Sequence, residues 1–220
     1  MTDLSPTAIV GDIASDLPGA AEVFRRHGIS FCCGGTLTLE EAAERHGLSA
    51  DALLAELQAL AAAAGTTAPQ ETLPLIDHIL TRYHQTHREE LEWLLPLAQK
   101  VETVHGDHDE APLGLTGALI ALGDELESHM RKEEQILFPM MRQGGHAMIA
   151  QPITVMRHDH DVAADLLDRV AQLTHGLTLP EGACRSWTAL YTGLRKFTDD
   201  LAAHIRLEND ILFPRFETAA

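Results

Sequence analysis

Hydrophobic residues in the second part of the chain recur at the spacing of an α-helix, and the alternation typical of a strand is absent. The first periodic stretch places one stripe of mostly apolar side chains on a single face: Ile76, Leu80, Tyr83, His84, His87, Leu91, Leu94, Ala98 and Val101. Similar patterns follow at about 113–142, 152–176 and 182–217, with turn signals between them at 106–112, 144–145 and 179–182. Four long amphipathic helices with short connections predict an all-α protein built on an antiparallel four-helix bundle.

The first part of the chain carries shorter helical signals. Ser5-Pro6 predicts a capped helix start, residues 38–41 predict a capping box, and Ser49 can cap a segment that runs through Leu60. A stretch rich in Ala, Gly and Thr at 61–70 then breaks the pattern. We therefore expect a small helical domain at residues 1–65 and the bundle at residues 66–220.

Composition and charge exclude several classes of function. The 220 residues include 16 Lys and Arg against 33 Asp and Glu, a formal net charge of −17, which repels nucleic acid and anionic membrane surfaces. No apolar run approaches the roughly 20 residues that cross a bilayer, and the first residues do not resemble a signal peptide. These features predict a cytoplasmic protein that binds neither nucleic acid nor membranes.

An internal repeat holds the most informative residues. His129-x-x-x-Glu133 followed by Ile-Leu-Phe-Pro at 136–139 matches His204-x-x-x-Glu208 followed by Ile-Leu-Phe-Pro at 211–214, with a spacing of 75 residues. A His and a Glu four residues apart leave the same helical face, one turn from each other. The repeat therefore predicts a duplicated helical hairpin whose two copies each offer one imidazole and one carboxylate.

Two further histidines complete the repeat. His84 and His160 precede His129 and His204 by 45 and 44 residues, and a turn signal lies midway in each interval. Each hairpin therefore brings its two histidines to the same level of the bundle.

Neighbouring histidines compete for these positions. His158 lies about 200° around the helix from the apolar stripe that includes His160, and we exclude it. His87 shares a face with His84, but the repeat aligns it with Ala163, so it ranks second.

The predicted cluster contains four imidazoles and two carboxylates in an apolar core: His84, His129, Glu133, His160, His204 and Glu208. Burying such groups without partners costs several kcal/mol each, so metal cations are the expected partners. Nitrogen and oxygen ligands without thiolate, in a helical bundle, favour two non-haem iron ions that Glu133 and Glu208 bridge, with an oxo bridge between the irons. Zinc and manganese stay open as alternatives. Octahedral geometry leaves at least one coordination position on each iron for water, nitric oxide or dioxygen.

Other residues are candidates for supporting chemistry. Glu125 and Asp200 lie one turn before the repeated histidines. They are candidates for second-layer hydrogen-bond partners or proton carriers, and the equally weighted alternative is that both are simply solvated acidic residues. Cys32 and Cys33 lie in a glycine-rich turn at 28–35 as reactive thiols, with a pair of small buried residues as the plainer alternative.

Phe31-Cys32-Cys33-Gly34-Gly35 ahead of this His and Glu cluster resembles the iron–sulfur cluster repair di-iron proteins of the RIC or YtfE/ScdA type, which are hemerythrin-like. The resemblance covers nearly the whole chain; Thr36, where a lysine is frequent, is a mild departure. It implies a di-iron centre in the bundle, an N-terminal domain with the cysteine pair, and repair of clusters damaged by nitric oxide or oxidative stress. Oxygen-carrying hemerythrins use an additional histidine, which argues against an oxygen carrier.

The expected function is therefore repair of damaged iron–sulfur proteins, by iron donation, by nitric oxide reduction at the di-iron site, or by both. Whether the protein is an enzyme of the nitric oxide reductase kind stays open. A sensor that binds nitric oxide or dioxygen without turnover is the alternative, an iron store is a third candidate, and a homodimer is left open.

Overall fold

The computed structural model describes residues 4–17, 19–29, 37–63 and 68–217, and every regular element within them is a helix. Four rods run through the larger part of the molecule, each a long helix with or without shorter continuations: α5 (Thr72–His78), η1 (Ile79–His84) and α6 (Gln85–His105); α7 (Leu115–Lys132), η2 (Glu133–Leu137) and α8 (Phe138–Arg142); α9 (Ala150–Leu173); and α10 (Arg185–Arg206), η3 (Leu207–Leu212) and α11 (Pro214–Glu217). The all-α prediction is confirmed.

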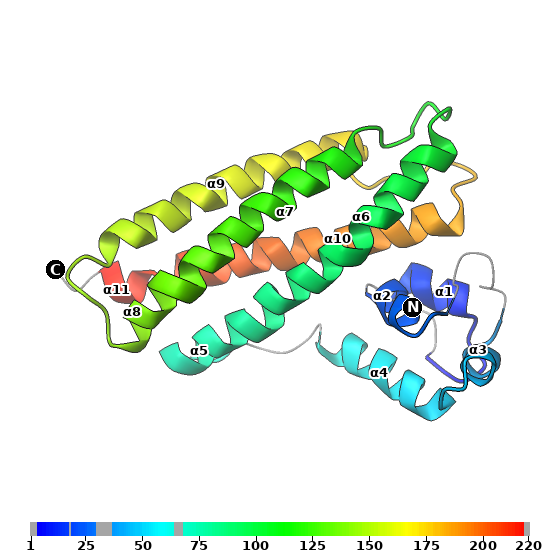
Figure 1. Cartoon of the computed structure of the whole chain (residues 1–220), viewed down its shortest axis with the longest axis horizontal. Coiled ribbons are helices and arrows are strands. Elements are labelled where there is room, and N and C mark those ends of the chain that lie inside the picture. Colours follow the sequence, from blue (N-terminus) through cyan, green and yellow to red (C-terminus); the bar gives the residue numbers. More distant parts are fainter. Residues whose placement is uncertain (1–3, 18, 30–36, 64–67, 218–220) are drawn as a thin grey trace.

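The four rods lie side by side and reverse direction at each connection (Figure 1). Helix α7 packs against both α6 and α9, and α6 also packs against α10. The rods cover the four predicted helical stretches, and the connections fall at the predicted turn signals. The antiparallel four-helix bundle is therefore confirmed. In the described part of the chain, no helix combines the length and apolar character needed to cross a membrane.

Three of the four rods contain a π-helical segment, which the sequence analysis did not anticipate. In η2 the N–H of Phe138 donates to the carbonyl of Glu133, and in η3 the N–H of Phe213 donates to that of Glu208, five residues back in both cases. The N–H of Gln85 donates to Leu80 in the same way at the end of η1. π-Helical turns are rare and frequently mark functional sites, and each of these lies at the level of the predicted cluster.

The N-terminal helices are α1 (Val10–Asp16), α2 (Ala20–Arg26), α3 (Leu39–Arg45) and α4 (Ala50–Ala63). The capping box at 38–41 is confirmed, because Thr38 accepts from the N–H of Glu41 and the Glu41 side chain accepts from the N–H of Thr38. Ser49 accepts from the N–H of Ala52, so its predicted capping role is confirmed too.

The predicted helix start at Ser5-Pro6 is wrong. Ser5 begins a turn, and the first helix starts only at Val10. The backbone explains the delay, since the N–H of Val10 donates to Leu37 and the N–H of Leu39 donates to Ala8. This short antiparallel bridge holds the chain extended just before the helix, which no local signal in the sequence reports.

The N-terminal helices share a hydrophobic core with one end of the bundle. Val10 and Ile13 of α1 and Phe24 of α2 are fully buried in the same cluster as Trp93 and Leu194 of the bundle. Helix α1 packs on α10, and α2 reaches α6, as the blue helices against the bundle show (Figure 1). The predicted boundary between residues 65 and 66 falls outside the described residues and stays a prediction.

A second cluster fills the opposite end of the bundle: Leu75, Ile76, Ile79, Leu137, Phe138, Met141, Ile149, Ile153, Met156, Leu207, Leu212 and Phe213. Along every rod the predicted His and Glu residues fall where the first cluster gives way to the second. The polar site is thus enclosed by apolar layers on both sides.

Helices α6 and α10 approach closely at Gly193. A Cβ added there would lie 2.2 Å from Cη2 of Trp93, a rigid and buried side chain. We expect Gly193→Ala to destabilise the fold by about 1–3 kcal/mol, because overpacking outweighs the gain of about 1 kcal/mol in helix propensity. Urea unfolding of the full chain measures this. Gly117→Ala in α7 is the control, since nothing lies near its Cβ position and it should stabilise by about 0.5–1 kcal/mol. A stabilising Gly193→Ala would contradict the close packing.

Candidate metal centre

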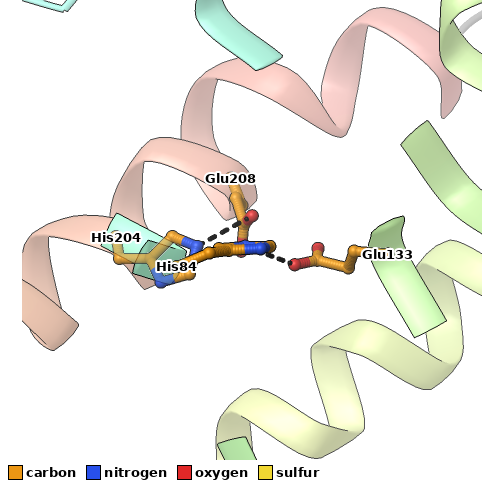
Figure 2. Close-up of side chains that lie close together, drawn as sticks. All are labelled: His84, Glu133, His204 and Glu208. Carbon is orange, nitrogen blue, oxygen red and sulfur yellow. Dashed lines mark hydrogen bonds and ion pairs between the residues drawn. The ribbon is translucent and has the colours of Figure 1, made fainter. Parts of the chain in front are cut away.

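Two buried groups of side chains at the middle of the bundle can each hold a metal ion. The first contains His84, Glu133, His204 and Glu208, and the second contains His129, His160 and again Glu208. Within each group the candidate ligand atoms all lie within 4.8 Å of one another. Figure 2 shows the first group, with His204 and Glu208 on one helix and Glu133 facing them from another. The six residues that the repeat singled out therefore converge.

The two carboxylates connect the groups. Glu208 places Oε1 3.1 Å from Nε2 of His204 and Oε2 3.1 Å from Nε2 of His160. Oε2 of Glu133 lies 3.3 Å from Nε2 of His84 and 3.2 Å from Nε2 of His129. Each carboxylate thus faces one imidazole from each half of the site, the arrangement that a bridging ligand needs.

The local helix geometry follows from the repeated sequence. Each His-x-x-x-Glu pair spans the junction between an α-helix and a π-helical segment, at α7–η2 and at α10–η3. Pro139 and Pro214, which close the two repeats, have no backbone N–H to donate, and proline disturbs the regular helical ladder before it. The duplicated Phe-Pro pairs were therefore the sequence signal for η2 and η3.

Second-layer partners hydrogen-bond two of the four imidazoles, and a carboxylate lies near a third. Nδ1 of His84 lies 2.9 Å from Glu134, and Nδ1 of His160 lies 3.0 Å from Oδ1 of Asn209. Nδ1 of His129 lies 3.5 Å from Asp159, without a hydrogen bond of good geometry. Such partners fix the ring so that Nε2 points at the metal.

Sequence reasoning missed these three partners. Glu134 and Asn209 directly follow Glu133 and Glu208, so they occupy equivalent positions in the two copies of the repeat. That spacing was the available signal.

Electrostatics favour cation binding. Burial would raise the pKa of Glu208, but the surrounding His204, His129 and His160 hold the pKa well below its usual value, so the carboxylate is ionised. Burial lowers the pKa of His204 to about 4, which leaves its imidazole neutral at pH 7. Burial also opposes the charged form of His129, yet Glu133 and Glu208 outweigh it and raise the pKa of His129 well above its usual value.

The residues fit a di-iron centre. Both oxygens of Glu133, Oε2 of Glu208 and Nε2 of His84 are buried without a hydrogen-bond partner of good geometry within the described structure. Unsatisfied buried groups of this kind are costly, and metal coordination satisfies them. Imidazole nitrogen and carboxylate oxygen, with two groups that share one carboxylate, are a donor set that suits paired iron ions.

The other predicted residues have different surroundings. His158 is exposed, as expected, and His87 is fully buried but belongs to neither group. Asp200 is paired with Arg82 and Lys196; burial would raise its pKa, but these two cations hold the pKa below its usual value. Glu125 is half-buried. The roles predicted for Glu125 and Asp200 stay predictions.

Cys32 and Cys33 lie outside the described residues. Their predicted chemistry therefore also stays a prediction.

The bundle and its site define the class of protein. Residues 75–216 match the hemerythrin HHE cation binding domain, and residues 6–61 match the ScdA_N domain, a domain of unknown function. An iron–sulfur cluster repair protein YtfE of Yersinia pseudotuberculosis serotype O:1b is 47% identical over 209 residues, 94% of this chain and 95% of the relative. The protein of that name from Pectobacterium carotovorum subsp. carotovorum is 46% identical over the same shares of the two chains. The chain belongs to the YtfE family of iron–sulfur cluster repair proteins.

Proposed function

We propose that this protein repairs iron–sulfur clusters that nitric oxide or oxidative stress has damaged. The relatives carry that function in their name, and the bundle matches a cation-binding domain over most of its length. The observation that carries the proposal is Glu208, whose two oxygens face imidazoles of both halves of the site. A paired metal centre inside a repair protein can donate iron, reduce nitric oxide, or do both.

We assign the ligands by their groups. His84 and His204 would hold one iron, His129 and His160 the other, and Glu133 and Glu208 would bridge them. A bound di-iron centre supplies open coordination positions for nitric oxide and a pool of iron for transfer.

The residues around the site position its ligands and exclude water. The six side chains are at most 4% exposed, so solvent does not compete with a small ligand inside the bundle. Glu134, which also accepts from Arg88, and Asn209, which also accepts from Arg157, orient His84 and His160. Glu125 would carry protons that nitric oxide reduction consumes, whereas Asp200, which is paired with Arg82 and Lys196, would serve as a second-layer hydrogen-bond partner.

The N-terminal segment would serve the exchange with clients. Cys32 and Cys33 would hold iron in transit or contact the damaged cluster, which suits thiolates as ligands of iron–sulfur clusters. The clients are iron–sulfur proteins, and repair of such proteins fits a cytoplasmic location.

Recovery of a damaged enzyme tests the proposal directly. A [4Fe–4S] enzyme is inactivated with nitric oxide, and its activity is followed after the iron-loaded protein is added. We expect recovery with the unmodified protein and none with the double variant Glu133→Gln, Glu208→Gln. Replacement of both Cys32 and Cys33 by Ser should keep the iron but slow recovery. Equal recovery with the glutamate double variant would show that repair does not run through this site.

Anaerobic addition of nitric oxide distinguishes an enzyme that reduces nitric oxide from a sensor that only binds it. Release of nitrous oxide would support reduction at the site, whereas a stable, stoichiometric and reversible adduct without gas would identify a sensor. Iron well above two ions per chain would identify a store.

Iron binding should release protons near neutral pH. The pKa values of His84 and His129 are raised by Glu133 and Glu208, although burial opposes this, so between pH 6.5 and the raised values the metal-free protein holds protons that a metal must displace. Affinity should therefore fall as the pH falls. Calorimetric titration of ferrous iron in buffers of different ionisation enthalpy measures the protons released. A binding enthalpy that does not depend on the buffer would contradict the expected displacement.

A further inference from the structure

The two halves of the duplicated site differ around Nδ1 of one histidine. His84, His129 and His160 each have a carboxylate or amide oxygen near Nδ1. Nδ1 of His204 is buried and has no such partner among the described residues. His84 and His160 form a hydrogen bond there, and His129 has the Asp159 carboxylate at 3.5 Å without a bond of good geometry. Among the four imidazoles, His204 is the one for which the described residues show no carboxylate or amide oxygen near Nδ1.

Different side chains surround His204 than surround its repeat equivalent, His129. Asp159, which precedes His160, faces His129. The equivalent residue in the other copy of the repeat is Tyr83, which precedes His84. Its ring stacks on that of His204, with the ring centroids 5.1 Å apart and the planes 6° from parallel. A stacked phenol ring offers no hydrogen bond to Nδ1 in the plane of the imidazole. The second neighbour is His87, whose ring centroid lies 5.5 Å from that of His204. The repeat places Ala163 at the position equivalent to His87, so this imidazole has no counterpart in the other half.

His87 is fully buried, and neither of its ring nitrogens has a hydrogen-bond partner of good geometry in the described structure. Oε2 of Glu90, another buried and unpartnered atom, lies 3.7 Å from its Nδ1. Glu90 is itself held by Lys196, which also bonds Asp200 at 2.7 Å. The Glu90 carboxylate is thus charge-compensated and fixed in place beside His87.

We propose that His87 is a positioning residue for His204. Its imidazole accepts the hydrogen bond of the His204 Nδ1–H through one water molecule, while its own Nδ1–H is directed at Glu90. His87 thereby takes the place of Asp159, the carboxylate that lies near Nδ1 of His129, the repeat equivalent of His204. This inference rests on the proposed di-iron centre, and it makes the iron positions inequivalent: the iron at His84 and His204 depends on His87, whereas the iron at His129 and His160 does not.

Variants of the iron-loaded full chain test the proposal. His87→Ala introduces the residue that the other copy of the repeat has at the equivalent position, Ala163. His87→Gln keeps a hydrogen-bonding side chain. Phe197→Leu is the matched control, because Phe197 packs on the His87 ring at 5.4 Å but offers no polar atom. With ⁵⁷Fe we expect His87→Ala to shift one of two Mössbauer doublets and to speed release of one iron to a chelator about tenfold or more. His87→Gln should restore most of both properties, and Phe197→Leu should leave the doublets unchanged.

A second readout is independent of iron chemistry. In the zinc-loaded chain, which is diamagnetic, the His204 Nδ1–H should give a ¹H–¹⁵N signal protected from solvent exchange, and His87→Ala should lose that protection. Two intact doublets and unchanged release in His87→Ala, or equal effects of His87→Ala and Phe197→Leu, would overturn the positioning role but leave the metal site standing. A wild-type chain that binds neither zinc nor iron would instead refute the metal site itself.

Discussion

Glu208→Leu is expected to abolish binding of both metal ions. Glu208 is the one carboxylate that belongs to both groups of candidate ligands in the described residues, and its two oxygens face His204 and His160. Without it, each position loses an anionic ligand, and Glu133 is the one carboxylate of the two groups left to compensate two cations. Removal of one partner from a buried ionised cluster costs about 3–5 kcal/mol, because His160 and His204 stay buried without the carboxylate, so folding of the variant is verified alongside its metal content.

Metal content of the purified protein measures this effect. Asp210→Asn is the control, because Asp210 is exposed two residues further along the same rod and should retain full iron. His160→Ala is the graded comparison, since His160 belongs only to the second group and its loss should remove one iron but keep the other. Far-UV circular dichroism verifies that the variants are folded. Full iron in Glu208→Leu would show that Glu208 does not bridge the two positions.

Ile13→Ala in the first helix is expected to destabilise the whole molecule by about 2–5 kcal/mol. Ile13 has no exposed surface, and helix α1 packs on α10, so the lost methyl groups leave a cavity between the N-terminal helices and the bundle. A shared core couples the two parts, and a cooperative transition carries the cost to both.

Calorimetric unfolding of the full chain, followed through the helical signal of the bundle, measures this coupling. Glu40→Ala in α3 is the control, because Glu40 is exposed and its loss should leave the transition in place. An unchanged bundle transition in Ile13→Ala, with a separate earlier transition for the N-terminal helices, would show that the two parts unfold independently.

The sequence predicted the bundle and the six converging residues because both depend on local periodicity. Helical periodicity determines the face of the helix on which a side chain lies, and the duplicated His-x-x-x-Glu pair indicates that two such faces meet in the bundle. The angular position around the helix was enough to select His160 as a candidate ligand over His158, which is exposed. His84 and His87 share one face, so only the repeat could rank them, and the structure includes His84 in the cluster and leaves His87 beside it.

Contacts between distant segments could not be predicted in this way. The pairing of Val10 with Leu37 delays the first helix, and no residue near Ser5 encodes it. Asp159 reaches His129 from another rod, so its role depends on tertiary packing. The π-helical turns shift the helical register by a fraction of a turn, which periodicity over a long window averages out.

Mössbauer spectroscopy with metal analysis on the purified ⁵⁷Fe-loaded protein tests the central claim most directly. Six side chains in two groups with a shared carboxylate predict two irons per chain in one magnetically coupled pair. A single iron, two magnetically independent irons, or no specifically bound metal would contradict the di-iron centre.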